Sequence, residues 1–159
     1  MSLTLEKPAS IQPEPENRTA QASPSLQDAL IRRQLEETAR QVLNELAIYE
    51  SYEQNWDGYG APEFEPELLR KAREVALFAL EVCLAEGVVP DRVTPGPASD
   101  GSVELEFKMG ERLVSFFLED GNGVIQIYRR EGTQSLDERR YREYVERALE
   151  GAILWLACG

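Results

Sequence analysis

The spacing of apolar residues changes near residue 92, and this change limits the folds that the chain can adopt. In residues 35–49 and 68–82, apolar side chains recur at alternating intervals of four and three, as they do on one face of a helix. After residue 92, they alternate with charged residues in Val103-Glu104-Leu105-Glu106-Phe107, which is the period of a half-buried β-strand. Helices and strands grouped in separate parts of a chain predict an α+β fold with an antiparallel sheet.

Two N-terminal helices are predicted before the sheet. The first begins at Ser25, which has the spacing of a capping box with Asp28, and ends near Tyr52. Its apolar face consists of Leu35, Ala39, Val42, Leu46 and Tyr49. The second begins at Pro66, which suits the first position of a helix, and ends at Gly87.

The sheet is predicted to be a meander of three or four strands followed by a C-terminal helix. Strands are expected at residues 103–108, 113–118 and 124–128, with a short one at 92–94 that Pro95 and Pro97 would end. Ser135 and Glu138 have the spacing of a second capping box, so the last helix is expected to follow them. Its apolar face would contain Tyr141, Val145, Ala148, Ala152 and Trp155 or Leu156.

The predicted domain covers residues 25–159, and residues 1–24 are expected to be a disordered tail. The tail has four prolines among Ser, Gln and Glu and no apolar periodicity, so it cannot bury enough surface to offset chain entropy. It shows no signal-peptide pattern, and the most apolar stretch, residues 152–158, is too short to span a bilayer. We therefore expect a cytoplasmic protein without a membrane partner, with Cys83 and Cys158 as buried small hydrophobes.

The absence of histidine and the strongly acidic balance restrict the classes of function. Without histidine, the chain lacks the usual general base near neutral pH and the commonest transition-metal ligand. No pattern indicates a catalytic residue, a cofactor or a metal site, so an enzyme is less expected than a binding module. The formal charge of −12 disfavours direct binding to nucleic acid and suits a basic protein partner.

The segment Asn55-Trp56-Asp57-Gly58-Tyr59-Gly60-Ala61-Pro62 between the two predicted helices has two interpretations. Its glycines and its Asp-Gly pair favour tight turns. Trp56 could be a recognition anchor, with Asp57 and Tyr59 presented beside it. Alternatively, Trp56 fills the space between the helices while Asp57 caps the turn, and this core plug is the favoured interpretation.

Acidic residues are concentrated around this loop. Between residues 36 and 67, nine carboxylates face one arginine, Arg40, which is a net charge of −8. Exposed helix faces commonly carry such charges, but this concentration also predicts a docking surface for a basic partner. The proposed partner-binding residues are Trp56, Asp57, Tyr59, Glu36, Glu37, Glu45, Glu50 and Glu53.

The leading hypothesis is a non-catalytic regulatory protein, such as an antitoxin-like inhibitor of a basic partner. One alternative is a carboxylate-based metal or small-ligand protein, or an enzyme, in which loops bring Asp57, Asp100 and Asp120 together. A second alternative is a charge mimic of nucleic acid. Leu113 and Phe117 lie out of phase with the other apolar residues of their strand, so the second sheet face is expected to be covered by a helix or by a homodimer.

Two segments resemble a family of small uncharacterised bacterial proteins. Their pattern is an Asn-Trp-Asp-Gly-x-Gly loop, a helix and a Pro-x-Asp-Gly-Gly turn before a strand that ends in an aromatic residue. The resemblance is carried by Asn55–Ala61 and by Thr94-Pro95 followed by Asp100–Phe107, and it covers about residues 53–128. Residues 96–99 are inserted before Asp100, and Ser102 replaces the second glycine of the turn. The resemblance implies an α+β fold and no assigned activity.

Overall fold

The computed structural model describes residues 25–119, 123–142 and 146–158. The predicted disordered tail, residues 1–24, lies outside the described residues. The described elements, in chain order, are α1 (Leu26–Tyr49), α2 (Pro66–Glu86), β1 (Arg92–Pro97), β2 (Val103–Met109), β3 (Arg112–Leu118), β4 (Ile125–Glu131), β5 (Gln134–Tyr141) and α3 (Glu146–Ala157). The α+β class predicted from the sequence is confirmed.

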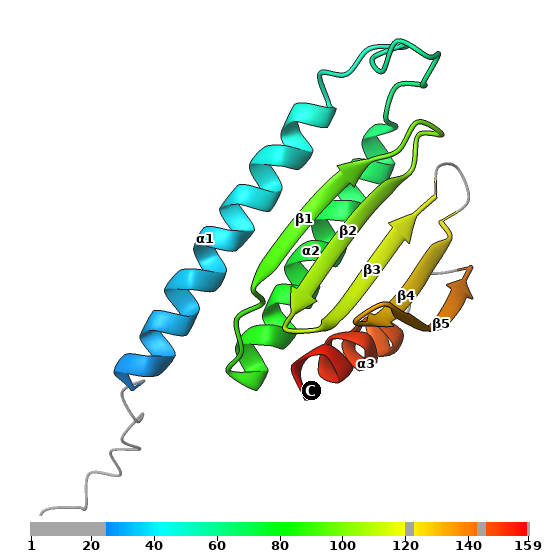
Figure 1. Ribbon diagram of the computed structural model, residues 1–159. Helices are drawn as coiled ribbons and strands as arrows, with labels where there is room; N and C mark the ends of the chain where they lie inside the picture. Colours follow the sequence, from blue (N-terminus) through cyan, green and yellow to red (C-terminus); the bar gives the residue numbers. More distant parts are fainter. Residues whose placement is uncertain (1–24, 120–122, 143–145, 159) are drawn as a thin grey trace, which may run out of the picture.

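The five strands form one antiparallel meander in the order β1-β2-β3-β4-β5. Figure 1 shows α2 and α3 behind the sheet, with α1 running along α2 beside the β1 edge. Accordingly, α1 contacts β1, α2 contacts β2 and β3, and α3 contacts β2, β3 and β4. The helices therefore cover one face of the sheet.

The core lies between this face and the helices. Alternation along the strands directs eight apolar side chains toward the helices, all of them buried: Val103, Leu105, Phe107, Val114, Phe116, Leu118, Ile125 and Ile127. The helices contribute the predicted stripes, and Leu35, Val42, Leu46 and Tyr49 of α1 are buried. Ala39 is half-buried against the same core.

The predicted helix boundaries in the first half of the chain follow from local capping. Ser25 accepts a hydrogen bond from the Asp28 amide, and the Asp28 carboxylate accepts one from the Ser25 amide. Pro66 begins α2, and Gly87 ends it in the left-handed conformation with φ 67°. One helix therefore stands at the N-terminal end of the described chain, and a second occupies residues 66–86.

The prediction for residues 134–141 was wrong. They form the fifth strand, so Ser135 and Glu138 do not cap a helix, and α3 begins only at Glu146. Gly132 adopts a positive φ of 57° in the tight turn that leads back along β4. Pairing with β4 therefore overrides a cap whose evidence was only two residues. Tyr141 belongs to β5, and Val145 lies outside the described residues.

Two smaller predictions are also corrected. β1 does not end before Pro95 but continues to Pro97, because an edge strand pairs on one side only and tolerates proline. Cys83 is buried in α2, and burial raises the pKa of its thiol to about 12. Cys158, however, is exposed just after α3.

The second sheet face carries Leu113, Ser115 and Phe117 of β3. Leu113 and Ser115 are buried, and Phe117 packs edge-on against Tyr128 with ring centroids 5.1 Å apart. In the view of Figure 1, the described helices lie on the opposite face. Coverage by a second copy of the chain stays a prediction. None of the described helices is both long and apolar enough to cross a membrane.

Candidate functional site

The loop between α1 and α2, residues 55–62, is closed by its own hydrogen bonds. The Asn55 amide donates to the Ala61 carbonyl at 2.7 Å, and the Gly58 amide donates to the Asn55 carbonyl at 3.0 Å. The Asn55 side-chain oxygen accepts a hydrogen bond from the Gly60 amide at 2.6 Å. Asn55 itself has a φ of 66°, a conformation that asparagine tolerates better than most residues. The loop thus satisfies its backbone locally.

Asp57 holds the tip of this loop. Its Oδ1 accepts hydrogen bonds from the Tyr59 amide at 2.8 Å and from the Ala61 amide at 3.0 Å. These backbone donors, Tyr59 first, hold the pKa of Asp57 below its usual value. The carboxylate therefore acts as a turn acceptor, as the core-plug interpretation expected.

Trp56 packs inward from the loop. Its Nε1 donates to the Pro62 carbonyl at 3.1 Å, and its ring stacks on Tyr52 at a centroid distance of 5.0 Å. Phe64 lies 5.6 Å away on the same cluster, which is packed against the main core. These contacts are those of a residue that fills space between two helices. A role of Trp56 in partner binding stays a prediction.

Tyr59 has the opposite environment. The residue is 94% exposed, the largest fraction among the exposed large hydrophobic residues of the described chain. It stands between Gly58 and Gly60, whose φ values of 77° and 92° shape the turn. The loop therefore buries one aromatic side chain and displays another.

The predicted acidic residues of α1 and the following turn are all exposed. Glu37 forms an ion pair with Arg40 on the same helix, and Glu50 pairs with Arg73 of α2. Within the described chain, Glu36, Glu45 and Glu53 form no ion pair. These three carboxylates keep their charge available at the surface.

The structure does not assemble the alternative carboxylate site from the residues that it describes. Asp100 accepts hydrogen bonds from the amide and the hydroxyl of Ser102, so it also serves a local turn. Asp120 lies outside the described residues. No group of three or more Cys, Asp or Glu residues that could hold a metal ion occurs among residues 25–119, 123–142 and 146–158.

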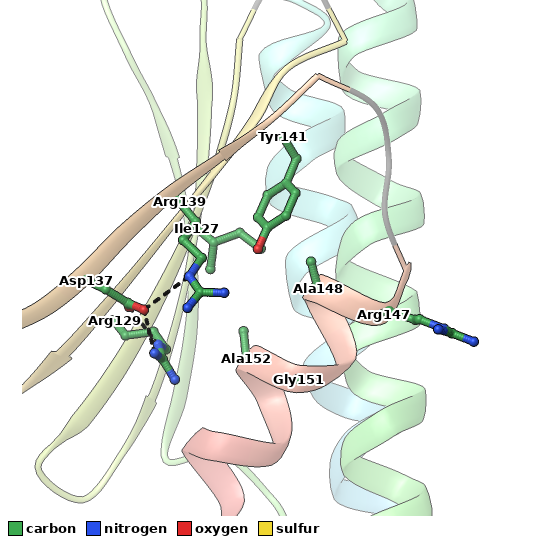
Figure 2. A pocket seen from close by; sticks show the side chains of 9 residues that line it. All are labelled: Ile127, Arg129, Asp137, Arg139, Tyr141, Arg147, Ala148, Gly151 and Ala152. Carbon is green, nitrogen blue, oxygen red and sulfur yellow. Dashed lines mark hydrogen bonds and ion pairs between the residues drawn. The ribbon is translucent and has the colours of Figure 1, made fainter.

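A pocket of about 250 Å³ lies between β5 and α3, and no pattern in the sequence had indicated it. We call it the arginine pocket; its walls are shown in Figure 2. The strands contribute Ile127, Arg129, Asp137, Arg139 and Tyr141. Helix α3 contributes Arg147, Ala148, Gly151 and Ala152.

Asp137 organises the two strand arginines of this pocket. It accepts two hydrogen bonds from Arg129, from Nε at 2.7 Å and from Nη2, and it lies 3.5 Å from Nε of Arg139. The pairing with Arg129 holds the pKa of Asp137 below its usual value. The Arg129 guanidinium also lies over the Trp155 ring, 5.3 Å from its centroid. Arg129 is thus held from two sides.

Sequence reasoning missed this pocket because it assigned residues 135–141 to a helix. In a strand, Asp137 and Arg139 lie two positions apart and share a face, and Arg129 of β4 is the register partner of Asp137. Recognition of the turn at Gly132 would have predicted this pairing.

Comparisons of the chain with protein families, curated protein sequences and solved structures give no match. The resemblance to small bacterial proteins therefore stays a prediction. The functional argument for the loop and for the arginine pocket therefore rests on their contacts, burial and charge.

Proposed function

We propose that the protein is a non-catalytic module that binds a basic partner protein and regulates it, with antitoxin-like inhibition as the specific form. The observation that carries this proposal is the loop of residues 55–62, which holds Tyr59 almost fully exposed on a closed scaffold. An exposed tyrosine offers a large contact area with few rotatable bonds. A loop that is already ordered loses little entropy when it binds.

Exposed carboxylates of α1 and of the turn that follows it support a basic partner. Glu36, Glu45 and Glu53 are exposed and, within the described chain, form no ion pair. Complementary charge accelerates encounter and favours partners of the opposite sign. In this proposal Tyr59 makes the central contact, Trp56 and Asp57 hold the loop, and the glutamates steer the approach.

The test is a pull-down from the native host with three baits and a fourth, matched control bait, and identification of bound proteins by mass spectrometry. The baits are the wild type, Tyr59→Ala, and a triple variant with Glu36, Glu45 and Glu53 changed to Gln. A matched control changes Glu86, Glu111 and Glu150, which are exposed elsewhere, to Gln. We expect the wild type and the control to retain one basic protein that both test variants lose.

Retention of the same proteins by all four baits would contradict the proposal. Circular dichroism of each bait shows that a lost partner does not reflect a lost fold. The carboxylate-based ligand protein and the charge mimic of nucleic acid stay predictions.

A further inference from the structure

The arginine pocket combines positive charge with free space, although the chain as a whole carries a net charge of −12. Three arginines and one aspartate line it, a formal charge of +2. Figure 2 shows the guanidinium groups of Arg129 and Arg139 and the hydroxyl of Tyr141 directed into the space between β5 and α3. Arg147 stands at the rim and points away from the other labelled side chains.

The opposite wall is built from small residues. Ala148, Gly151 and Ala152 of α3 face the strand arginines, so no long side chain from this part of the helix fills the space. A Cβ atom placed on Gly151 would meet no heavy atom within 4 Å. The pocket therefore has room for a group that the described chain does not supply.

The strand arginines retain hydrogen-bond donors. A guanidinium has five N–H donors, and Arg129 uses two nitrogens, Nε and Nη2, on Asp137. Arg139 approaches Asp137 only at 3.5 Å, and its side chain is 68% exposed. Asp137 and Trp155 fix the position of Arg129 while its remaining donors stay available.

We propose that the arginine pocket binds a small phosphomonoester through Arg129, Arg139 and Tyr141. Such a group has three terminal oxygens and a charge of about −1.5 to −2 at pH 7, which suits three donor side chains. Arg129, Arg139 and Asp137 give the interior of the pocket a formal charge of +1, and Arg147 adds a further positive charge at the rim. Arginine is well suited to bidentate contact with phosphate. The volume of about 250 Å³ lies below that of pockets for drug-sized molecules, so the ligand is small.

Calorimetric titration with phenyl phosphate at constant chloride concentration tests the proposal. We expect saturable binding to the wild type and binding about tenfold weaker to Arg139→Gln, because a charge-assisted hydrogen bond is lost. Arg139 is mostly exposed, so the variant retains its fold. The matched control is Arg130→Gln, an exposed arginine of β4 one residue from Arg129, and it should bind as the wild type does.

A steric variant addresses the space itself. Gly151→Leu places a side chain at the pocket wall without a clash at Cβ, and we expect it to abolish binding. The proposal is overturned if the wild type shows no saturable binding up to about 10 mM phenyl phosphate. A dissociation constant above this concentration corresponds to a favourable binding free energy of less than about 3 kcal/mol. The proposal is equally overturned if Arg139→Gln binds as tightly as the wild type, or if Arg130→Gln weakens binding as much.

The source of the phosphomonoester is distinguished by a second probe, a short peptide that contains phosphotyrosine. Tighter binding of the peptide than of phenyl phosphate would assign the pocket to a phosphorylated protein side chain. Weaker binding would assign it to a free phosphorylated metabolite. The comparison is interpreted once saturable binding of phenyl phosphate has been measured. Neither result depends on the proposed partner surface at Tyr59.

Discussion

The loop at residues 55–62 and the arginine pocket handle polar groups in opposite ways. In the loop, Asn55 and Asp57 accept hydrogen bonds from the amides of their own turn, and the Trp56 indole donates to a carbonyl six residues away. In the pocket, Arg129 and Asp137 come from different strands, and among residues 25–119, 123–142 and 146–158 Arg139 has one polar contact, with Asp137 at 3.5 Å. The loop is complete without a ligand, whereas the pocket has unused hydrogen-bonding capacity.

This difference explains why only one of the two regions was visible in the sequence. Local hydrogen bonds require particular residues at short spacing, so they leave a motif. A pocket between two strands and a helix requires only that distant residues meet, so it leaves none. The motif at residues 55–62 therefore indicated a stable turn, whereas the available guanidinium donors lie in the arginine pocket, which has no sequence motif.

The largest effect is expected from Trp56→Ala. Truncation removes a ring that stacks on Tyr52 and contacts Phe64, and we expect the free energy of unfolding to fall by about 2–4 kcal/mol. Urea denaturation measures it. The control, Tyr59→Ala, removes an exposed ring and should change stability by less than about 0.5 kcal/mol. Equal, small losses for both variants would refute the core-plug assignment of Trp56.

The next effect compares the two regions through one kind of substitution, glycine to alanine. Gly60 in the loop has a φ of 92° and open space around its Cβ position, so Gly60→Ala is strained only through its backbone. We expect a loss of about 1–2 kcal/mol in the free energy of unfolding. An unchanged denaturation midpoint would show that the loop relaxes at no cost.

A smaller change of opposite sign is expected at the pocket. Gly151 lies inside α3, where alanine is favoured over glycine, and an added Cβ meets no neighbour. Gly151→Ala should raise the free energy of unfolding by about 0.5–1 kcal/mol. Thermal denaturation of this variant beside Gly60→Ala gives the contrast directly, and a loss of stability in both would remove the distinction between the two sites.

The smallest effect concerns pH. Backbone amides of Tyr59 and Ala61 lower the pKa of Asp57 in the folded state, so its stabilising contribution is full above the unfolded pKa of about 3.9 and is lost as pH falls through the lower folded pKa. We expect the difference in unfolding free energy between the wild type and Asp57→Asn to shrink as the pH is lowered from about 5 to about 3. A difference that stays constant in urea denaturation across this range would contradict the assigned hydrogen bonds.

Much of the fold could be predicted from the sequence where local chemistry decides the structure. The capping box at Ser25, the start of α2 at Pro66 and its end at Gly87 depend on residues within one turn of each other. The alternation in β2 likewise predicted which side chains face the helices. The closed loop around Asp57 belongs to the same class.

Residues 134–141 show the limit of that reasoning. Their serine and glutamate match the start of a helix, yet pairing of Asp137 with Arg129 places them in a strand at the sheet edge. Pairing with β4 gives alternate residues of β5 backbone hydrogen bonds along the whole strand. A cap formed by two side chains offers fewer hydrogen bonds, so the strand is favoured.

The sequence by itself determined the α+β class, the starts of the first two helices, the end of the second and the turns between them, because each depends on contacts between residues close in the chain; α1 ends at Tyr49, three residues before the predicted Tyr52. Only the tertiary structure decided that five strands form the sheet and that Arg129, Arg139 and Tyr141 face α3 across a pocket. These features depend on contacts between elements: β5 pairs with β4 across the hairpin at Gly132, and α3 reaches its place only by packing against β2, β3 and β4, which requires closure of a longer stretch of chain.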